Sequence, residues 1–392
     1  MKIVKTLLDT ARPHFSEGGR FHRFYYAYDA FETFLFVPGE ATRGGAHIRD
    51  GIDLKRTMFT VIVAMIPCLL FGIWNVGHQH FVAVGEMTGP GEGFLTKFAY
   101  GSIRVVPMLV VVYAVGLSTE FAFASIRKHP VTEGFLVTGM LIPLILPPEI
   151  PLWMVALATI FAVVIGKEAF GGTGMNILNV ALVARVFLFF AYPTYLSGDR
   201  VWVAGDASGF VDGFSGATPL AVAYLDGMEG LEGAAPFVYD LEAMILGTIP
   251  GSIGETSAIA IGIGALLLIV TGIGSWRIMA SVVAGTLATG ALLAWSEIAP
   301  FQGVPAHYHL FMGSMLFATV FMATDPVTAA QTRTGQYVYG FLIGVFGMVI
   351  RVLNPAYPEG WMLAILLMNV FAPTIDHVVL GANIRRRMRR AL

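Results

Sequence analysis

Residues 58–76 of the chain read MFTVIVAMIPCLLFGIWNV, a run that contains no charged side chain. A helix needs about 20 mostly apolar residues to cross the hydrocarbon core of a bilayer. Further apolar segments follow this one along the whole chain. We expect about ten membrane spans, several of them short, near residues 58–76, 101–124, 134–146, 152–166, 179–192, 257–274, 277–295, 310–323, 337–352 and 361–379.

The composition of the whole chain supports this interpretation. Of 392 residues, 56% are hydrophobic and only 13% are charged, and the mean hydropathy is +0.72. Soluble domains carry about 25% charged residues, so the sequence indicates an all-α integral membrane protein. The net charge of -2 does not suggest a nucleic-acid partner. A single cysteine, Cys68, excludes an intrachain disulfide and a Cys-rich metal or iron–sulfur site built by this chain alone.

The distribution of basic residues predicts the orientation in the membrane. Lys and Arg gather in the N-terminal arm, in the turn IRKH at residues 126–129 and in the C-terminal segment NIRRRMRRAL at residues 383–392. With ten spans, all three lie on one side, so we expect both termini in the cytoplasm. The acidic loop at residues 194–256 then lies outside. The N-terminal segment lacks the apolar core of a signal peptide.

The two halves of the membrane region resemble each other. ILNVALVARVFLFFAYPT at residues 177–194 matches VLNPAYPEGWMLAILLMNVFAPT at residues 352–374. MLIPLILPPEIPLW at residues 140–153 likewise matches MLFATVFMATDPVT at residues 315–328. Five spans in each half would make the repeats inverted, and inverted repeats with broken helices usually hold ligand sites at their interface. The alternative is that Pro and Gly merely kink packed helices.

This pattern predicts five parts along the chain. They are a cytoplasmic arm (1–56), a first membrane repeat (57–193), an outer loop (194–256), a second repeat (257–380) and a basic C-terminus (381–392).

Four ionisable residues stand in or beside apolar spans, where a charge is costly and therefore a functional candidate. Glu120, Asp325 and Asp376 lie near span ends. Together with carbonyl groups of broken helices, these carboxylates would suit a hard cation such as Na⁺. Each could instead be a headgroup-level or turn residue. Arg185 stands within a span, so it needs either a partner or an anionic ligand.

Two asparagines, Asn176 and Asn179, open the fifth expected span. One helical turn apart, they would share a face and could offer donors and acceptors to a planar polar ring. Helix capping is the alternative. The glycine-rich stretch before them, GKEAFGGTGMN at residues 166–176, lacks the ending of a P-loop, which argues against a nucleotide site of that type.

The outer loop contains DGFSGAT at residues 212–218. Gly216 and Ala217 leave the hydroxyl of Thr218 with little shielding, although an ordinary turn would have the same composition. The pattern D-x-x-[ST]-G-A-T, formed by Asp212, Ser215 and the three residues after it, resembles the site at which a flavin transferase joins FMN, through its phosphate, to a threonine hydroxyl. That transferase acts outside the cytoplasm, where the charge distribution independently places Thr218.

Further stretches extend this resemblance over essentially the whole chain. They are HIRDGIDLKR, RKHPVTEGFLVT, KEAFGGTGMNILN, FLFFAYP, IPGSIGE, FMATDP, RVLNPAYPEG and APTIDHVV. Together they resemble the family of B subunits of the Na⁺-translocating NADH:quinone oxidoreductase, a translocase. The related D subunit of the Rnf complex shares the core and the flavin threonine, but the long N-terminal arm here favours the B subunit.

The resemblance implies a membrane subunit that works with five others. Electrons would arrive from the FMN of the C subunit, pass to FMN on Thr218, then to noncovalent riboflavin and finally to ubiquinone, coupled to Na⁺ export. It implies riboflavin contacts at Asn176 and Asn179, with Arg185 a further candidate for cofactor binding. It also implies a quinone site at Gly116 and Glu120 and a Na⁺ path through Glu120, Asp325 and Asp376. Val180 stands where the family often has a proline. An Rnf-type subunit and a solute channel or transporter are the alternatives.

Overall fold

The computed structural model describes residues 2–16, 18–36, 44, 54–128, 134–206, 209–212, 214–232, 239–295, 301, 303–354 and 359–391. Throughout these residues the regular structure is helical, without a β-strand. Parts of the expected N-terminal arm and of the stretch RVLNPAYPEG lie outside them. In chain order the helices are α1 (Lys2–Phe15), α2 (Tyr25–Leu35), α3 (Leu54–Val84), α4 (Phe94–Arg127), α5 (Gly134–Leu144), α6 (Leu152–Gly166), α7 (Val180–Ala191), α8 (Pro219–Glu232), α9 (Leu241–Leu246), α10 (Ala258–Val270), α11 (Trp276–Trp295), α12 (Tyr308–Phe311), α13 (Met315–Phe317), α14 (Arg333–Leu353) and α15 (Trp361–Ala391).

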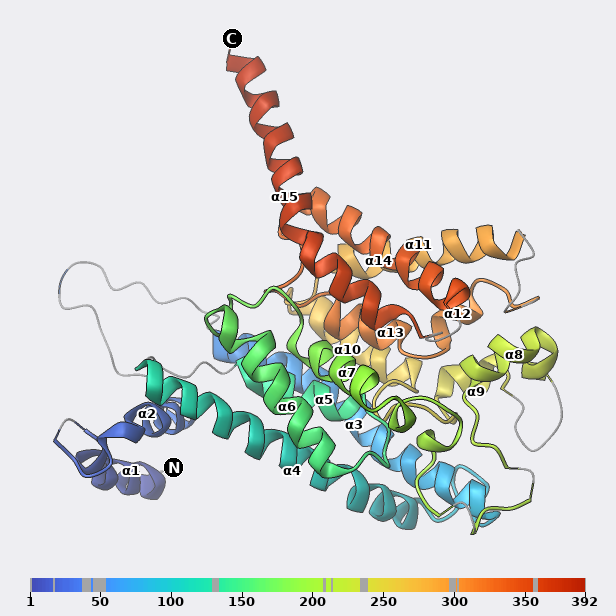
Figure 1. The fold of residues 1–392 in the computed structure, drawn as a ribbon, viewed down its shortest axis with the longest axis horizontal. Coiled ribbons are helices and arrows are strands. Elements are labelled where there is room, and N and C mark those ends of the chain that lie inside the picture. The colour runs from blue at the N-terminus through green and yellow to red at the C-terminus, as the bar shows by residue number, and fades with distance from the viewer. Residues whose placement is uncertain are drawn as a thin grey trace.

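The fold confirms an all-α membrane protein. Six helices of the described chain are long and apolar enough to cross a bilayer: those at 55–84, 94–127, 152–170, 276–295, 333–353 and 361–390. Three shorter apolar helices, α5, α7 and α10, occupy further expected spans. The segment expected at 310–323 is broken into α12, α13 and a π-helical turn at Ala318–Met322. In Figure 1 the short helices α5, α7 and α10 lie between α4 and α6 on one side and α11, α14 and α15 on the other.

Helices α3 and α4 are longer than the expected spans, because each includes buried polar residues beyond the apolar run. Lys97, fully buried near the start of α4, donates a hydrogen bond to the carbonyl of Gly89 at 2.6 Å, and its Nζ lies 3.1 Å from Nδ1 of His78 on α3. Close approach of the two helices depends on Gly77 and Gly101. A Cβ at either position would overlap a backbone carbonyl of the other helix.

The end of α5 is completed by the second half of the chain. Half-helices that end inside a protein leave carbonyl groups that need donors. The carbonyl of Leu144 accepts from the backbone N–H of Gly254 at 2.7 Å, and that of Leu146 accepts from Ile253 at 3.2 Å. Both leucines are fully buried. The loop before α10 is therefore part of the core of the first half.

Candidate functional site

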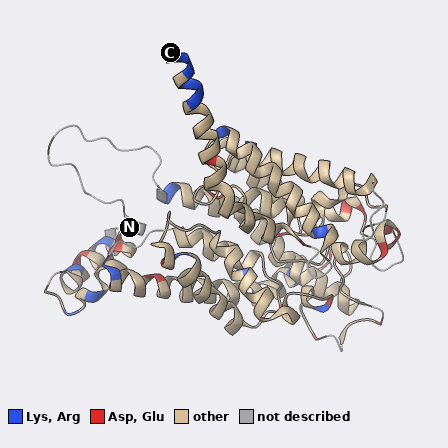
Figure 2. Cartoon of the chain, turned by 45° about the horizontal axis from the view of Figure 1, so that its top comes forward, with Lys and Arg blue, Asp and Glu red and all other residues tan. Residues whose placement is uncertain are grey.

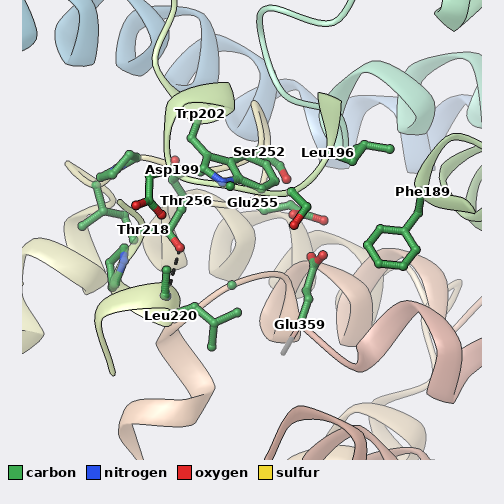
Figure 3. A pocket seen from close by; sticks show the side chains of 18 residues that line it. Phe189, Leu196, Asp199, Trp202, Thr218, Leu220, Ser252, Glu255, Thr256 and Glu359 are labelled. Carbon is green, nitrogen blue, oxygen red and sulfur yellow. Dashed lines mark hydrogen bonds between the residues drawn. The ribbon is translucent and has the colours of Figure 1, made fainter. Parts of the chain in front are cut away.

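A pocket beside Thr218 joins the loop expected outside, residues 194–256, to the apolar helices. We call it the Thr218 pocket. Its lining residues come from the outer loop, from the end of α7 and from the segments that precede α10 and α15; those labelled in Figure 3 are Phe189, Leu196, Asp199, Trp202, Thr218, Leu220, Ser252, Glu255, Thr256 and Glu359. The close-up shows the carboxylates of Glu255 and Glu359 pointing toward each other, with Trp202 beside them. The pocket thus combines aromatic, hydroxyl and acidic side chains.

The backbone around Thr218 is held by its neighbours. Thr218 stands immediately before α8, and its Oγ1 accepts a hydrogen bond from the N–H of Ala221 at 3.2 Å, as an N-cap residue does. Gly216 has a φ of +72°, and a Cβ there would lie 2.9 Å from the carbonyl oxygen of Asp199, so the position favours glycine. Tyr239 donates its hydroxyl to the carbonyl of Ala217 at 2.5 Å. These contacts fix the backbone on both sides of the threonine.

The other two residues of the loop motif lie away from the pocket lining. Asp212 and Ser215 are not among the lining residues, and Oγ of Ser215 accepts from the N–H of Ala217 at 3.3 Å. Asp212 is exposed. Asp212 and Ser215 are therefore better placed to contact another protein than to contact a ligand in the pocket.

Arg185 finds its partners at the edge of the same pocket. Its Nη1 donates to Oε1 of Glu255 at 2.9 Å and its Nη2 to Oε2 of Glu359 at 2.6 Å. The side chains are 4%, 5% and 13% exposed in that order. The expectation that Arg185 needs a partner or an anion is met by two carboxylates. Sequence reasoning missed both as site residues, and the only signal for them was the charge of Arg185 inside an apolar span.

The electrostatics of this cluster are unusual for acidic groups. Glu255 lies in the loop before α10, and its burial raises the pKa of its carboxyl to about 8, with the nearby Glu359 acting in the same direction and Arg185 opposing it. A second buried arginine, Arg351 of α14, also interacts with Glu359, while donating to the carbonyls of His309 and Met312. Two guanidinium groups therefore face two carboxyl groups.

A second pocket lies at the other end of α7. We call it the Asn179 pocket; its polar lining residues are Thr138, Lys167, Thr173, Asn176, Asn179, Thr324 and Asp325. Asn179 is the N-cap of α7, since its Oδ1 accepts from the N–H of Leu182 at 3.2 Å, so the capping interpretation is confirmed for this residue. Its Nδ2 donates to Oδ2 of Asp325 at 3.4 Å. Asn176 precedes the helix, so the expected shared helical face is wrong, yet both asparagines line the pocket.

The expected carboxylates lie in three different settings. Asp325 lines the Asn179 pocket and accepts from the N–H of Val327 at 3.0 Å and from the hydroxyl of Thr328 at 3.1 Å. Glu120 is buried and forms an ion pair with Lys167, which lines the same pocket. Asp376 instead accepts from backbone N–H groups at the start of α14. In the described part of the chain, no group of three or more His, Cys, Asp or Glu side chains could hold a metal ion.

Gly116, the expected quinone residue, faces a packed side chain. A Cβ at this position would overlap the ring of Phe135 on α5. Both residues are buried, and neither lines the Asn179 pocket. Gly116 therefore sets the distance between α4 and α5.

Comparison with known proteins places this geometry in a family context. A family model described as the NQR2, RnfD, RnfE family matches residues 41–385. The chain is 47% identical to a protein of Stutzerimonas stutzeri, with 99% of each chain covered. It is 46% identical to a protein of Azotobacter vinelandii at the same coverage, and 47% identical to one of Chromohalobacter salexigens, covering 99% of this chain and 96% of that protein. All three are named as the B subunit of a Na(+)-translocating NADH-quinone reductase.

Proposed function

The chain belongs to the NQR2, RnfD, RnfE family, and from that premise we propose that it is the B subunit of a Na⁺-translocating NADH:quinone oxidoreductase. The observation that carries the proposal is the 46–47% identity over 99% of the chain to relatives of that name. The protein would pass electrons to a quinone within a multi-subunit membrane complex. The family also includes Rnf-type subunits, which work between ferredoxin and NAD. The electron donor of the purified complex distinguishes the two.

We propose that Thr218 carries FMN through a phosphoester. Oγ1 accepts rather than donates its observed hydrogen bond, so an ester oxygen could keep that contact. Trp202 and Phe189 in the same pocket offer aromatic surface for a flavin ring. When bound, the flavin supplies the one-electron chemistry. The chain's part is to fix the attachment point, which the contacts of Gly216 and Tyr239 support.

The Asn179 pocket is our proposed site for noncovalent riboflavin and for the coupled cation. Asn176 and Asn179 line it, and amide groups can hydrogen-bond a planar polar ring. Asp325 shares the pocket, so a change in charge on a ligand there would act on this carboxylate with little screening. Glu120 would act on the pocket through Lys167. Gly116 and Glu120, one helical turn apart on α4, are our proposed quinone contacts. Asp376 would serve the Na⁺ path from a separate position.

We further propose that both termini are cytoplasmic, that Thr218 faces outward in the inner membrane, and that a flavin transferase and the C subunit meet the chain there. The acidic outer loop and the basic C-terminus support this orientation.

In-gel fluorescence tests the flavin proposal. The chain is produced in a host that supplies a flavin transferase, separated on a denaturing gel and viewed under ultraviolet light. We expect a fluorescent band that Thr218→Ala abolishes and that Thr248→Ala, a threonine of the same loop, leaves intact. A dark band from the unmodified sequence, or a bright one from Thr218→Ala, would refute the attachment. A solute channel or transporter would give the dark result.

A further inference from the structure

Helix α15 continues well beyond the helix that it packs against. Asp376 on α15 accepts hydrogen bonds from the N–H groups of Gln331 at 2.7 Å and Thr332 at 3.0 Å, just before α14 begins. Asp376 therefore marks the level at which α14 begins. The helical residues 377–391 lie past this level, a length of roughly 22 Å at about 1.5 Å per residue. Figure 1 shows these last turns as a single helix that runs out beyond its neighbours.

This extension has two chemically different faces. Arg385, Arg386, Arg387, Arg389 and Arg390 are all exposed, and Figure 2 shows them as the blue end of the chain. No acidic residue follows Asp376 in the sequence. Leu380, Ile384 and Met388, spaced four residues apart, are 50%, 56% and 55% exposed. Residues at this spacing share one face of a helix, so an apolar stripe runs along the basic helix.

We propose that the extension of α15 binds anionic phospholipid headgroups, with the stripe of Leu380, Ile384 and Met388 immersed at the edge of the bilayer. A helix with a basic face and an apolar face lies in the membrane interface, and Arg forks match phosphate oxygens. The span expected from the sequence, 361–379, ends within α15, and the extension continues the same helix, so its stripe starts at the depth of the headgroups.

Two features favour lipid over simpler roles for the arginines. Basic residues stabilise the C-terminal end of a helix, but that effect is confined to the last turn, whereas Arg385 and Arg386 stand before it. An acidic protein surface would pair with the basic face and leave the apolar stripe exposed to water. At an anionic bilayer surface the headgroups can pair with the arginines while the acyl chains cover the apolar stripe.

Site-directed spin labelling of the full chain in nanodiscs tests the proposal. One label is placed at Ile384→Cys, on the apolar stripe, and the matched control at Ala382→Cys, about 200° away around the helix. Cys68 is buried and 2% exposed, so it does not compete for the label. Accessibility to oxygen, which enters lipid, is compared with accessibility to a water-soluble nickel chelate. Discs contain phosphatidylcholine alone or with phosphatidylglycerol.

We expect phosphatidylglycerol to raise the oxygen-to-nickel ratio at position 384 by roughly twofold or more and to leave position 382 in water. Replacing Arg385, Arg386, Arg389 and Arg390 with glutamine should abolish the rise. Equal water exposure at both positions would overturn the proposal. So would an oxygen-to-nickel ratio at position 384 that does not change when phosphatidylglycerol is present. Protection of position 384 that occurs only in the assembled complex would identify a protein partner instead and overturn it as well.

Discussion

Replacing Glu255 with glutamine is expected to stabilise the protein in alkaline solution. Burial in the loop before α10 raises the pKa of this carboxyl from 4.5 to about 8. The folded state therefore holds a proton that the unfolded chain releases at lower pH. Stability from this group is fully present below pH 4.5 and is lost as the pH rises through about 8. Glutamine resembles the protonated acid and does not titrate, so the variant should not lose this stability as the pH rises.

The structure sets the size of the effect. A difference between 4.5 and about 8 corresponds to an upper bound of roughly 5 kcal/mol at 1.36 kcal/mol per pH unit. Arg185 stays paired in the variant, because Glu359 contacts its Nη2 through both carboxylate oxygens at 2.8 and 2.6 Å. The substitution therefore removes a titration without leaving a buried guanidinium alone.

Thermal unfolding followed by tryptophan fluorescence checks this at a fixed scan rate between pH 5 and pH 9. The unmodified protein should lose Tm as the pH rises, and Glu255→Gln should show a flatter profile with a higher Tm at pH 9. Glu242→Gln, an acid on α9 outside the buried cluster, serves as the control and should follow the unmodified protein. A Tm that is already independent of pH, or a Glu255→Gln profile with the original slope, would refute the reasoning.

Three further predictions concern other parts of the molecule. Lys167→Met removes the cation beside buried Glu120 and should lower the free energy of unfolding by about 3–5 kcal/mol. Adding Glu120→Gln should restore part of this stability in the same unfolding assay. Gly344→Ala should lower Tm, because its Cβ would overlap a carbonyl of α11, whereas Gly262→Ala meets open space and should not; equal Tm values would contradict the packing. Asp376→Ala should raise the Na⁺ concentration needed for half-maximal turnover of the complex, and an unchanged Na⁺ dependence would count against a role in the ion path.

Apolar runs predicted the positions of the membrane helices well. The predicted ends of α3 and α4 were wrong because both helices continue through buried polar residues. The run at 58–76 lies within α3, but α3 continues to Val84 through His78. Lys97 similarly extends α4 back to Phe94. Each looks in sequence like a residue at the water surface. Their contact with each other at 3.1 Å satisfies the polar groups inside the protein, and only tertiary structure supplies that contact.

The sites were predicted only as far as local pattern reaches. Asn179 and Asp325 were both singled out, and the fold brings them to 3.4 Å. Arg185 was singled out as a charge that needs a partner, but Glu255 and Glu359 stand 70 and 174 residues away in sequence. A charged residue indicates that a counter-charge exists without indicating where it is. The roles of these residues toward flavin, quinone and Na⁺ remain predictions.

The hydrogen bonds at the end of α5 have a consequence for the order of synthesis. The carbonyls of Leu144 and Leu146 accept hydrogen bonds from the N–H groups of Gly254 and Ile253. A ribosome adds these two donors about a hundred residues later. At about 5–20 residues per second this interval is roughly 5–20 seconds. During that time the nascent first half holds a helix end whose buried carbonyl groups lack these donors. A ribosome stalled before residue 253 would therefore expose a first half that cannot close its own core, and quality-control proteases of the membrane should recognise it.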